Sequence, residues 1–549
     1  MRKRSLLLLA GAAAIVASLV VGPAATAGPD RAQAGTVVFI HDQEPPNLRP
    51  TWVDNNLYAT SLVLNNIWYG GQIRDANAGW VTRLFTGPPK MLKSSPLTVS
   101  FQFSPKANWS DGTPVTCADW KATWQVFINP ANNVVSRTGH EDIKSVTCKG
   151  KSGVIVFKKV YADWQTLVNE PANNGVLQAK TVAANPDMNK AFENSVNVSS
   201  GPWKFQSWQK GVQITVVKNP KFTAGPPMKL DRVVFRYIAD TNARFQALKA
   251  GEGQVMEPQP QLQIADFQKD KNFVVDSKAG YSFEHLDMQF GPKGAPALRQ
   301  AYVRQALITG INRPQIAAAL YGTIAPGLPT LQSLIFKTFE KGYQKNFAQW
   351  SFSQAKVISI LKGKGCTGGP SKPSAGNSDI FSCPGIGKLS FRFSTTSGNQ
   401  LRALTFEIIQ RQLKSVGIEL VPRFQPAGLL FGTTLPSSDW DIIMFTWVQT
   451  PSSKIISKDL YACGGEENYM NYCNRKASAL IEKTAVTLDE SVRTKLLNQA
   501  EQIMAKDVPS IPMFVRPGFV IRAKTVGGPV FNTTTEGSPW NVGAWSSTS

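Results

Sequence analysis

The sequence predicts an α/β fold, because helical and strand patterns follow one another along the chain. In residues 400–416 the apolar side chains recur at helical spacing, Gly417 can end the helix, and Ile418 and Leu420 begin a strand. Residues 199–240 predict a hairpin, a short apolar strand and the start of a helix. Such alternation indicates an α/β architecture. At 549 residues the chain is long enough for two to four units of ~150 residues each.

The N-terminus has the three parts of a secretory signal. Positions 2–4 are basic, residues 6–21 are apolar, and small residues lead to Ala27. We therefore predict a signal peptide at residues 1–27, cleaved near Ala27, and export of the protein. No cysteine lies near this region, so a lipid anchor is not expected. An uncleaved anchor helix is the alternative, because the apolar stretch approaches the ~20 residues that span a bilayer.

Residues 35–67 predict a buried strand at 36–40, a proline-rich turn at 45–50 and then a helix. Residues 68–199 contain a further helix and an apolar strand at 154–157. We expect this second part of the chain to form a separate small lobe.

Residues 200–285 return the chain to the first lobe. Residues 203–216 predict a hairpin, and residues 233–238 predict a short apolar strand. Asp240 can cap the helix that follows, and Gly251 can end it in a left-handed conformation.

Helices dominate the chain after residue 286. The stretch 362–388 is rich in Gly, Ser and Pro and predicts a surface loop. An apolar strand is predicted at 442–450, an amphipathic helix at 492–503 and an extended segment at 510–515. The chain shows no internal repeat.

Six cysteines in a chain predicted to be exported indicate disulfides. Their clustering along the sequence narrows the fifteen possible pairings. No Cys-x-x-Cys occurs, and no histidine lies at metal-ligand spacing from a cysteine, so structural bonds are favoured over redox or zinc chemistry. The predicted pairs are Cys117–Cys148, Cys366–Cys383 and Cys463–Cys473.

The chain is strongly basic, with a formal net charge of +22. Its basic residues are dispersed, and an exported protein seldom meets nucleic acid, so no nucleic-acid partner is expected. The sequence also lacks Gly-x-Ser-x-Gly, Gly-x-x-x-x-Gly-Lys-Ser/Thr and His-Glu-x-x-His. We therefore predict neither an enzyme nor a bound cofactor or metal.

Three weaker patterns have structural explanations. Ser353 and Lys356 satisfy Ser-x-x-Lys, but the companion motifs are missing and a helix start explains them. Asp439 and Asp441 form a carboxylate pair, yet they precede an apolar strand and are expected to end a turn. Asp111 is expected to cap its own Asp-Gly turn.

Five segments, in order, resemble the extracytoplasmic solute-binding proteins of family 5, the peptide- and nickel-type binding components of ABC importers. They cover nearly the whole chain after the signal, and only their joint occurrence makes chance improbable. The segments are 44–50 (Glu-Pro-Pro-Asn-Leu-Arg-Pro), 109–119 around Trp-Ser-Asp-Gly-Thr-Pro, 199–240, 303–313 and 441–447.

The resemblance implies a periplasmic-binding-protein-like type II fold, in which two large lobes close about a hinge and a small lobe is added. It also implies a monomer that captures a peptide or peptide-like solute and delivers it to an ABC permease in the cytoplasmic membrane. The expected division is residues 35–67, 200–285 and 510–549 for lobe I, 68–199 for lobe II, and 286–509 for lobe III.

The resemblance further places the end of the 442–450 strand beside the ligand. It implies that Trp447 contacts the ligand and that Thr446 and Val448 offer backbone groups to an extended peptide. Tyr469 and Asn471, in the loop between two paired cysteines, are further candidate contacts. A core role for Trp447 is the alternative, because large aromatic residues are often buried without touching a ligand.

The chain departs from the peptide binders at Thr450, where that family places an aspartate against the ligand's α-amino group. A hydroxyl cannot neutralise a buried ammonium. Either Glu466 or Glu467 replaces the aspartate, or the ligand has no free amine. The alternative functions are binding of a non-peptide solute, such as a metal chelate, sugar or opine-like compound, and a non-transporting scaffold or regulator of the cell envelope.

Overall fold

The computed structural model describes residues 35–172, 175–225, 227–447 and 456–548. The predicted signal peptide with its cleavage near Ala27, and the ligand candidates Val448 and Thr450, lie outside these residues. No helix in the described ranges is long and apolar enough to cross a membrane. We use lobes I, II and III below for the three segments that the sequence predicts.

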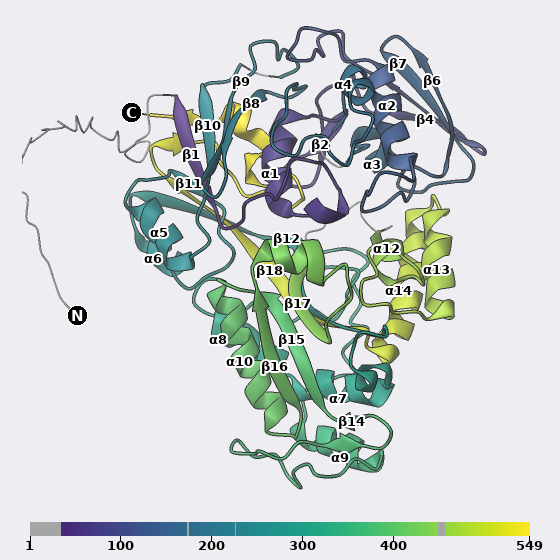
Figure 1. The fold of residues 1–549 in the computed structure, drawn as a ribbon, viewed down its shortest axis with the longest axis vertical. Helices are drawn as coiled ribbons and strands as arrows, with labels where there is room; N and C mark the ends of the chain where they lie inside the picture. Colours follow the sequence, from purple (N-terminus) through teal and green to yellow (C-terminus); the bar gives the residue numbers. More distant parts are fainter. Residues whose placement is uncertain (1–34, 173–174, 226, 448–455, 549) are drawn as a thin grey trace, which may run out of the picture.

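A ten-stranded mixed sheet runs through lobes I and III (Figure 1). Its strand order is β16-β15-β17-β12-β18-β11-β1-β10-β9-β8, so strands from the beginning, middle and end of the chain lie side by side. The strands are β1 (Thr36–His41), β8 (Trp203–Gln209), β9 (Gln213–Lys218), β10 (Arg232–Tyr237), β11 (Val255–Met256), β12 (Phe273–Met288), β15 (Ser390–Thr396), β16 (Glu419–Gln425), β17 (Ile442–Trp447) and β18 (Ser510–Ala523).

Two long antiparallel strands, β12 and β18, join the two halves of this sheet. Their pairing is regular up to Ala279, opposite Pro517, and resumes at Phe283, opposite Val515. Gly518 pairs with Lys278 just before this interruption, and a Cβ there would fall 1.7 Å from the ring of Phe531. The ladder between the two strands is therefore interrupted at residues 280–282 of β12, opposite Arg516 of β18.

Lobe I confirms the local predictions for residues 200–251. The hairpin forms from β8 and β9, and β10 pairs with β1 in parallel. Asp240 caps the next helix through an oxygen that accepts the backbone N–H of Ala243 at 2.8 Å, and Gly251 has a φ of +77°. Its other elements are η1 (Val53–Asn55), α1 (Tyr58–Ile67), α5 (Thr241–Lys249), α6 (Ile264–Lys269), β19 (Val526–Gly527), η5 (Ser538–Ala544) and β20 (Ser546–Ser547).

Lobe II has a four-stranded sheet of its own, in the order β4-β5-β7-β6. Thr116 and Asp119 form a capping box at the start of α2, and Asp111 accepts hydrogen bonds from the backbone N–H and hydroxyl of Thr113, as expected for a turn. The elements are β2 (Gln72–Arg74), β3 (Trp80–Thr82), β4 (Lys90–Ser94), β5 (Leu97–Gln102), α2 (Cys117–Ile128), β6 (Ile143–Lys149), β7 (Ser152–Phe157), α3 (Trp164–Asn169) and α4 (Ala179–Ala184).

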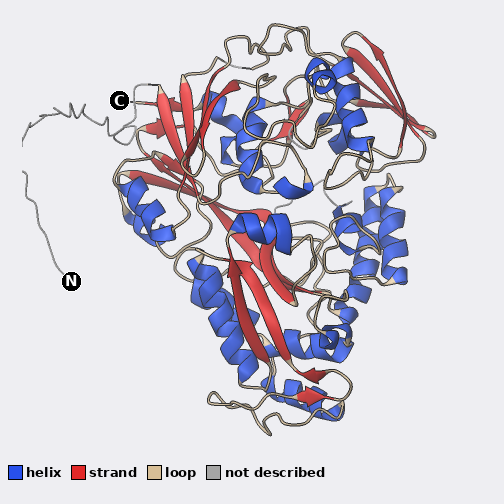
Figure 2. Cartoon of the chain, in the orientation of Figure 1, coloured by secondary structure: helices blue, strands red, loops and turns tan. Residues whose placement is uncertain are grey.

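Helices flank the part of the central sheet in lobe III (Figure 2). Ser353 caps α9 by accepting the backbone N–H of Lys356 at 3.2 Å, which confirms a helix start there. The helices are η2 (Pro296–Arg299), α7 (Ala301–Gly310), α8 (Arg313–Tyr321), α9 (Gln354–Gly363), α10 (Gln400–Lys414), α11 (Ala427–Leu429), η3 (Leu430–Thr434), α12 (Ile456–Tyr461), α13 (Arg475–Ala485) and α14 (Glu490–Asp507), and the short strands are β13 (Ser382–Cys383) and β14 (Gly387–Lys388).

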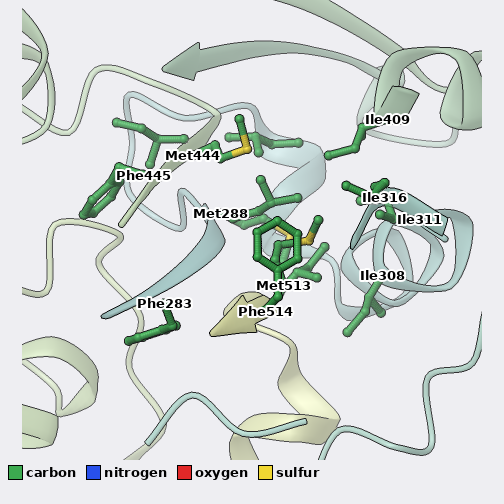
Figure 3. Packing of buried hydrophobic residues seen from close by; sticks show 14 of the residues in the cluster. Phe283, Met288, Ile308, Ile311, Ile316, Ile409, Met444, Phe445, Met513 and Phe514 are labelled. Atoms are coloured by element: carbon green, nitrogen blue, oxygen red, sulfur yellow. The ribbon is translucent and has the colours of Figure 1, made fainter. Parts of the chain in front are cut away.

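Two hydrophobic cores hold the molecule together. One combines lobes I and II, and the other combines lobe III with part of lobe I. In the second core, Met288, Met444 and Phe514 from the strands meet Ile308, Ile316 and Ile409 from the helices (Figure 3). Lobe II therefore shares its apolar interior with lobe I.

The three predicted disulfides are present: Cys117–Cys148, Cys366–Cys383 and Cys463–Cys473. The first ties α2 to β6 in lobe II. The second closes the surface loop predicted at 362–388, and the third closes the loop before α13.

Candidate ligand-binding site

A cavity of about 380 Å³ lies where the three lobes meet. Lobe I contributes residues from the chain after β1, from the start of α1 and from β18, including Tyr58 and Arg516. Lobe II contributes Thr138 and Glu170, and lobe III contributes Trp447. Because no single lobe encloses this space, its shape depends on the lobes being closed together.

The end of β17 reaches the cavity, as the resemblance implied. Thr446 and Trp447 both line it. The Trp447 ring packs edge-on against Phe445, with ring centroids 4.9 Å apart, and its buried Nε1 has no acceptor in the described chain. Trp447 is thus held by the aromatic core on one side while it borders the cavity on another.

The two ligand candidates in the loop closed by Cys463 and Cys473 differ in their position relative to the cavity. Tyr469 lines the cavity. Asn471 is not among the lining residues; its amide donates to Oε1 of Gln289 at 2.8 Å and to Oγ of Ser438 at 3.2 Å. Asn471 also has a φ of +56°, so its visible role is to hold a tight turn.

Two buried acids form one wall of the cavity. Asp459 accepts hydrogen bonds from Thr138 Oγ1 at 2.7 Å and from Ser136 Oγ at 3.1 Å. Glu467 accepts one from Asn56 Nδ2 at 2.9 Å. The side chains around these acids belong to lobes I and II, whereas the acids belong to lobe III.

Burial raises the pKa of both acids toward or above neutral pH. Burial and the charge of Glu466 raise the pKa of Asp459 to about 6. Burial and the nearby Asp459 raise the pKa of Glu467 to about 8. No lysine or arginine of the described chain pairs with Glu467, so a positive group of a ligand would find a carboxylate ready to ionise there.

A second pair of acids lies at the lobe I and lobe II side of the cavity. Burial and Glu536 raise the pKa of Glu170 well above its usual value, and burial raises that of Glu536 to about 7. The two carboxyls interact directly, so the pair is best described as sharing a proton. Near neutral pH the cavity thus carries less negative charge than its count of acids suggests.

Two arginines lie on the wall formed by the central sheet. Arg402 pairs with the buried Glu284 at 2.8 Å and also donates to Thr396 Oγ1 at 2.7 Å. The hydroxyl of Thr446 donates to Glu284 and accepts a hydrogen bond from Arg402. Arg516 donates to the same hydroxyl at 3.4 Å. The Thr446 side chain therefore joins β17 to the charged groups of β12, α10 and β18.

Contacts between lobes II and III close the cavity. Arg493 of α14 pairs with Asp163 of lobe II at 2.5 Å, and both side chains are buried. The backbone N–H of Ala162 donates to the carbonyl of Ala485 at 2.7 Å. Glu466 accepts the backbone N–H of Arg137 at 2.7 Å, so this acid serves the lobe contact and not the cavity wall.

The sequence missed Asp459, Glu170 and Arg516 as lining residues. Of these, Arg516 had a visible signal, because it is a charged residue directly after the apolar stretch 510–515 that was predicted to be extended. The acids had none, since nothing local distinguishes them from surface carboxylates. The carboxylates Asp439 and Asp441 are paired with Arg392 at 2.7 and 3.0 Å and do not line the cavity.

The described residues contain no group of three or more His, Cys, Asp or Glu side chains that could hold a metal ion. The architecture is that of a two-lobed binding protein with an added small lobe and a cavity between the lobes. The model of the bacterial extracellular solute-binding proteins, family 5 middle, matches residues 92–466. The chain therefore belongs to this family of ABC-transporter solute-binding proteins, which are not enzymes.

Individual proteins agree with this assignment. The oligopeptide-binding protein OppA of Mycobacterium tuberculosis is 26% identical over 499 residues, which cover 88% of this chain and 80% of OppA. The solved structure of the oligopeptide-binding protein AppA from Bacillus subtilis in complex with a nonapeptide matches with a TM-score of 0.82 at 20% identity, covering 94% and 99% of the two chains. NikZ from Campylobacter jejuni in complex with Ni(L-His) matches with a TM-score of 0.80 at 20% identity, covering 94% and 100%. The likeness to these structures shows the type of fold and confirms the predicted class.

Proposed function

We propose that the protein captures a peptide or peptide-like solute between its lobes outside the cytoplasmic membrane and delivers it to an ABC permease. The observation that carries the proposal is the cavity of about 380 Å³, which takes its walls from all three lobes and includes the end of β17. A solute held there contacts side chains that come together only in the closed molecule. Binding therefore favours closure, because a ligand stabilises the state in which it has more contacts.

The hinge of this closure is proposed at the register change between β12 and β18. Ala279 and Phe283 flank the interruption on β12, and their partners Pro517 and Val515 flank it on β18. Few backbone hydrogen bonds hold the strands at this point, so a change of φ and ψ there moves lobe III relative to lobe I at low cost. The contact between Arg493 and Asp163 then forms when the lobes meet.

Glu467 is proposed to take over the role of the aspartate that the family resemblance led us to expect where this chain has Thr450. It is buried and lines the cavity, and within the described chain it has an amide and no cation as its partner. A ligand ammonium beside it would lower its pKa from about 8 and bind as an ion pair. A peptide with a free amino end thus remains compatible with a threonine at position 450.

The test is native mass spectrometry of the purified protein, followed by fluorescence titration with trialanine, N-acetyl-trialanine and an unrelated sugar. The chain has 14 tryptophans, so lobe closure is expected to shift the intrinsic emission. The proposal expects a co-purified peptide or a saturable response to at least one of the peptides. If neither appears while the sugar binds, the peptide assignment is wrong.

A non-peptide solute is the second candidate function. It is favoured by the similarity of fold to NikZ in complex with Ni(L-His), together with the acids of the cavity wall. Titration with Ni²⁺ and L-histidine, together and separately, distinguishes the two functions. Binding of the mixture alone, without any response to peptides, would support the chelate.

A further inference from the structure

The guanidinium of Arg516 has few hydrogen bonds to the part of the chain that the structure describes. Arg516 lies in β18 and lines the cavity, where it is partly exposed. Its single hydrogen bond within the described chain runs from Nη1 to the hydroxyl of Thr446, and at 3.4 Å it is long. An arginine side chain has five N–H donors, so most donors of Arg516 have no acceptor within the described chain.

The neighbouring Arg402, in the same wall of the cavity, has acceptors for all three guanidinium nitrogens. Arg402 donates to both oxygens of Glu284 and to the hydroxyls of Thr396 and Thr446. It is buried, with a side-chain exposure of 7%. All three nitrogens of the Arg402 guanidinium thus have acceptors, whereas among the described residues only one nitrogen of Arg516 has an acceptor.

The nearby acids already have other partners. Glu284 is held by Arg402, and Asp42 accepts a hydrogen bond from Gln259 at 2.5 Å and lies 3.5 Å from His41. No carboxylate oxygen of the described chain lies within ion-pair distance of Arg516. Burial and the like charge of Arg402 lower the pKa of Arg516, while the charges of Glu284 and Asp42 act in the opposite direction without pairing with it.

We propose that Arg516 binds a carboxylate group of the solute, at a wall of the cavity distinct from that of Asp459 and Glu467. The planar guanidinium matches a carboxylate in a two-bond arrangement, which is the geometry that its free donors offer. The ligand is then dipolar, with its negative group at Arg516 and any positive group at Glu467. This inference rests on the proposed function for the location of the solute, and it adds the chemical class of one end.

The experiment compares trialanine with its C-terminal amide, and adds succinate as a carboxylate that is not a peptide. Each probe is titrated by tryptophan fluorescence into the wild type, Arg516→Gln and Arg411→Gln. Arg411 is an exposed residue of α10 outside the cavity, so its variant has the same change of charge without the proposed contact. We expect trialanine to bind the wild type about 10- to 100-fold more tightly than the amide, and Arg516→Gln to abolish that difference.

The outcomes separate this inference from the proposed function. If peptides bind, but the acid and the amide bind equally and Arg516→Gln changes neither, the proposed function stands and the role of Arg516 is overturned. If only succinate binds, and Arg516→Gln abolishes it, the peptide assignment fails and the carboxylate site stands. If no carboxylate probe binds the wild type, the carboxylate site is overturned.

The melting temperature without ligand supplies an independent measurement. A guanidinium that serves the ligand contributes little to the empty protein, so Arg516→Gln is expected to melt at or above the wild-type temperature. A clear decrease that Arg411→Gln does not share would assign Arg516 to the structure instead. Should Arg516→Gln fail to fold, the comparison of acid and amide on the wild type still decides.

Discussion

Glu467→Gln is expected to remove much of the pH dependence of the protein's stability in the absence of ligand. The pKa of Glu467 is raised from 4.5 to about 8 by burial and by Asp459. Between these two pH values the folded protein holds a proton that the unfolded chain releases. The contribution of the Glu467 carboxyl to the free energy of unfolding is therefore greatest at low pH and is lost as the pH rises towards 8.

The magnitude follows from the two pKa values. At pH 7 a group with a pKa of about 8 is protonated roughly ten times in eleven, and at pH 5 it is protonated almost completely. For one site the free energy of unfolding then rises by about 2 kcal/mol from pH 7 to pH 5. Glutamine keeps the hydrogen-bonding shape and carries no charge at either pH, so this increase disappears.

The assay is urea unfolding of the wild type and Glu467→Gln at pH 5, 7 and 9, each without ligand. Glu407→Gln is the matched control, because Glu407 is exposed on α10. We expect the control to keep the wild-type pH dependence. An unchanged difference between pH 5 and pH 7 in Glu467→Gln would refute the argument that burial holds a proton on this side chain.

Three other changes have defined expectations. Arg493→Ala removes the cation from the buried ion pair with Asp163 and is expected to lower the free energy of unfolding by about 3–5 kcal/mol, measured in urea; a loss below 1 kcal/mol would show that the pair is solvated. Trp447→Ala is expected to weaken solute binding by about tenfold or more and to reduce the fluorescence response; unaltered binding would assign the ring to the core alone. Replacing Cys463 and Cys473 together by serine opens a ten-residue loop and is expected to lower the urea stability by about 2–3 kcal/mol, whereas equal stability would contradict the chain-entropy estimate.

Local patterns predicted most of the individual elements. The amphipathic pattern at 400–416 corresponds to α10 (Gln400–Lys414), and the strand predicted at 442–450 corresponds, in its described part, to β17 (Ile442–Trp447). Both depend on side-chain periodicity, which is a property of neighbouring residues. The three disulfide pairs were predictable for a related reason, since each closes a short loop.

The candidate site was predicted only in part. Trp447 and Tyr469 line the cavity as expected, whereas Asn471 holds a turn beside it. Glu467 was proposed from the sequence as one of two substitutes for a missing aspartate, and only the structure separates it from Glu466, which bonds a backbone amide of lobe II. The sequence provides no basis for choosing between Glu466 and Glu467, because the two acids are consecutive residues.

The sequence by itself determined the α/β class, the family and the covalent cross-links, because each is carried by residues close together or by motifs in a fixed order. Only the tertiary structure decided which charged side chains line the cavity. Glu170, Glu467 and Arg516 are brought to one cavity by a sheet that pairs strands from distant parts of the chain. Burial in that cavity then raises the pKa of the two acids, and no carboxylate of the described residues pairs with Arg516; neither effect exists until the lobes have folded against one another.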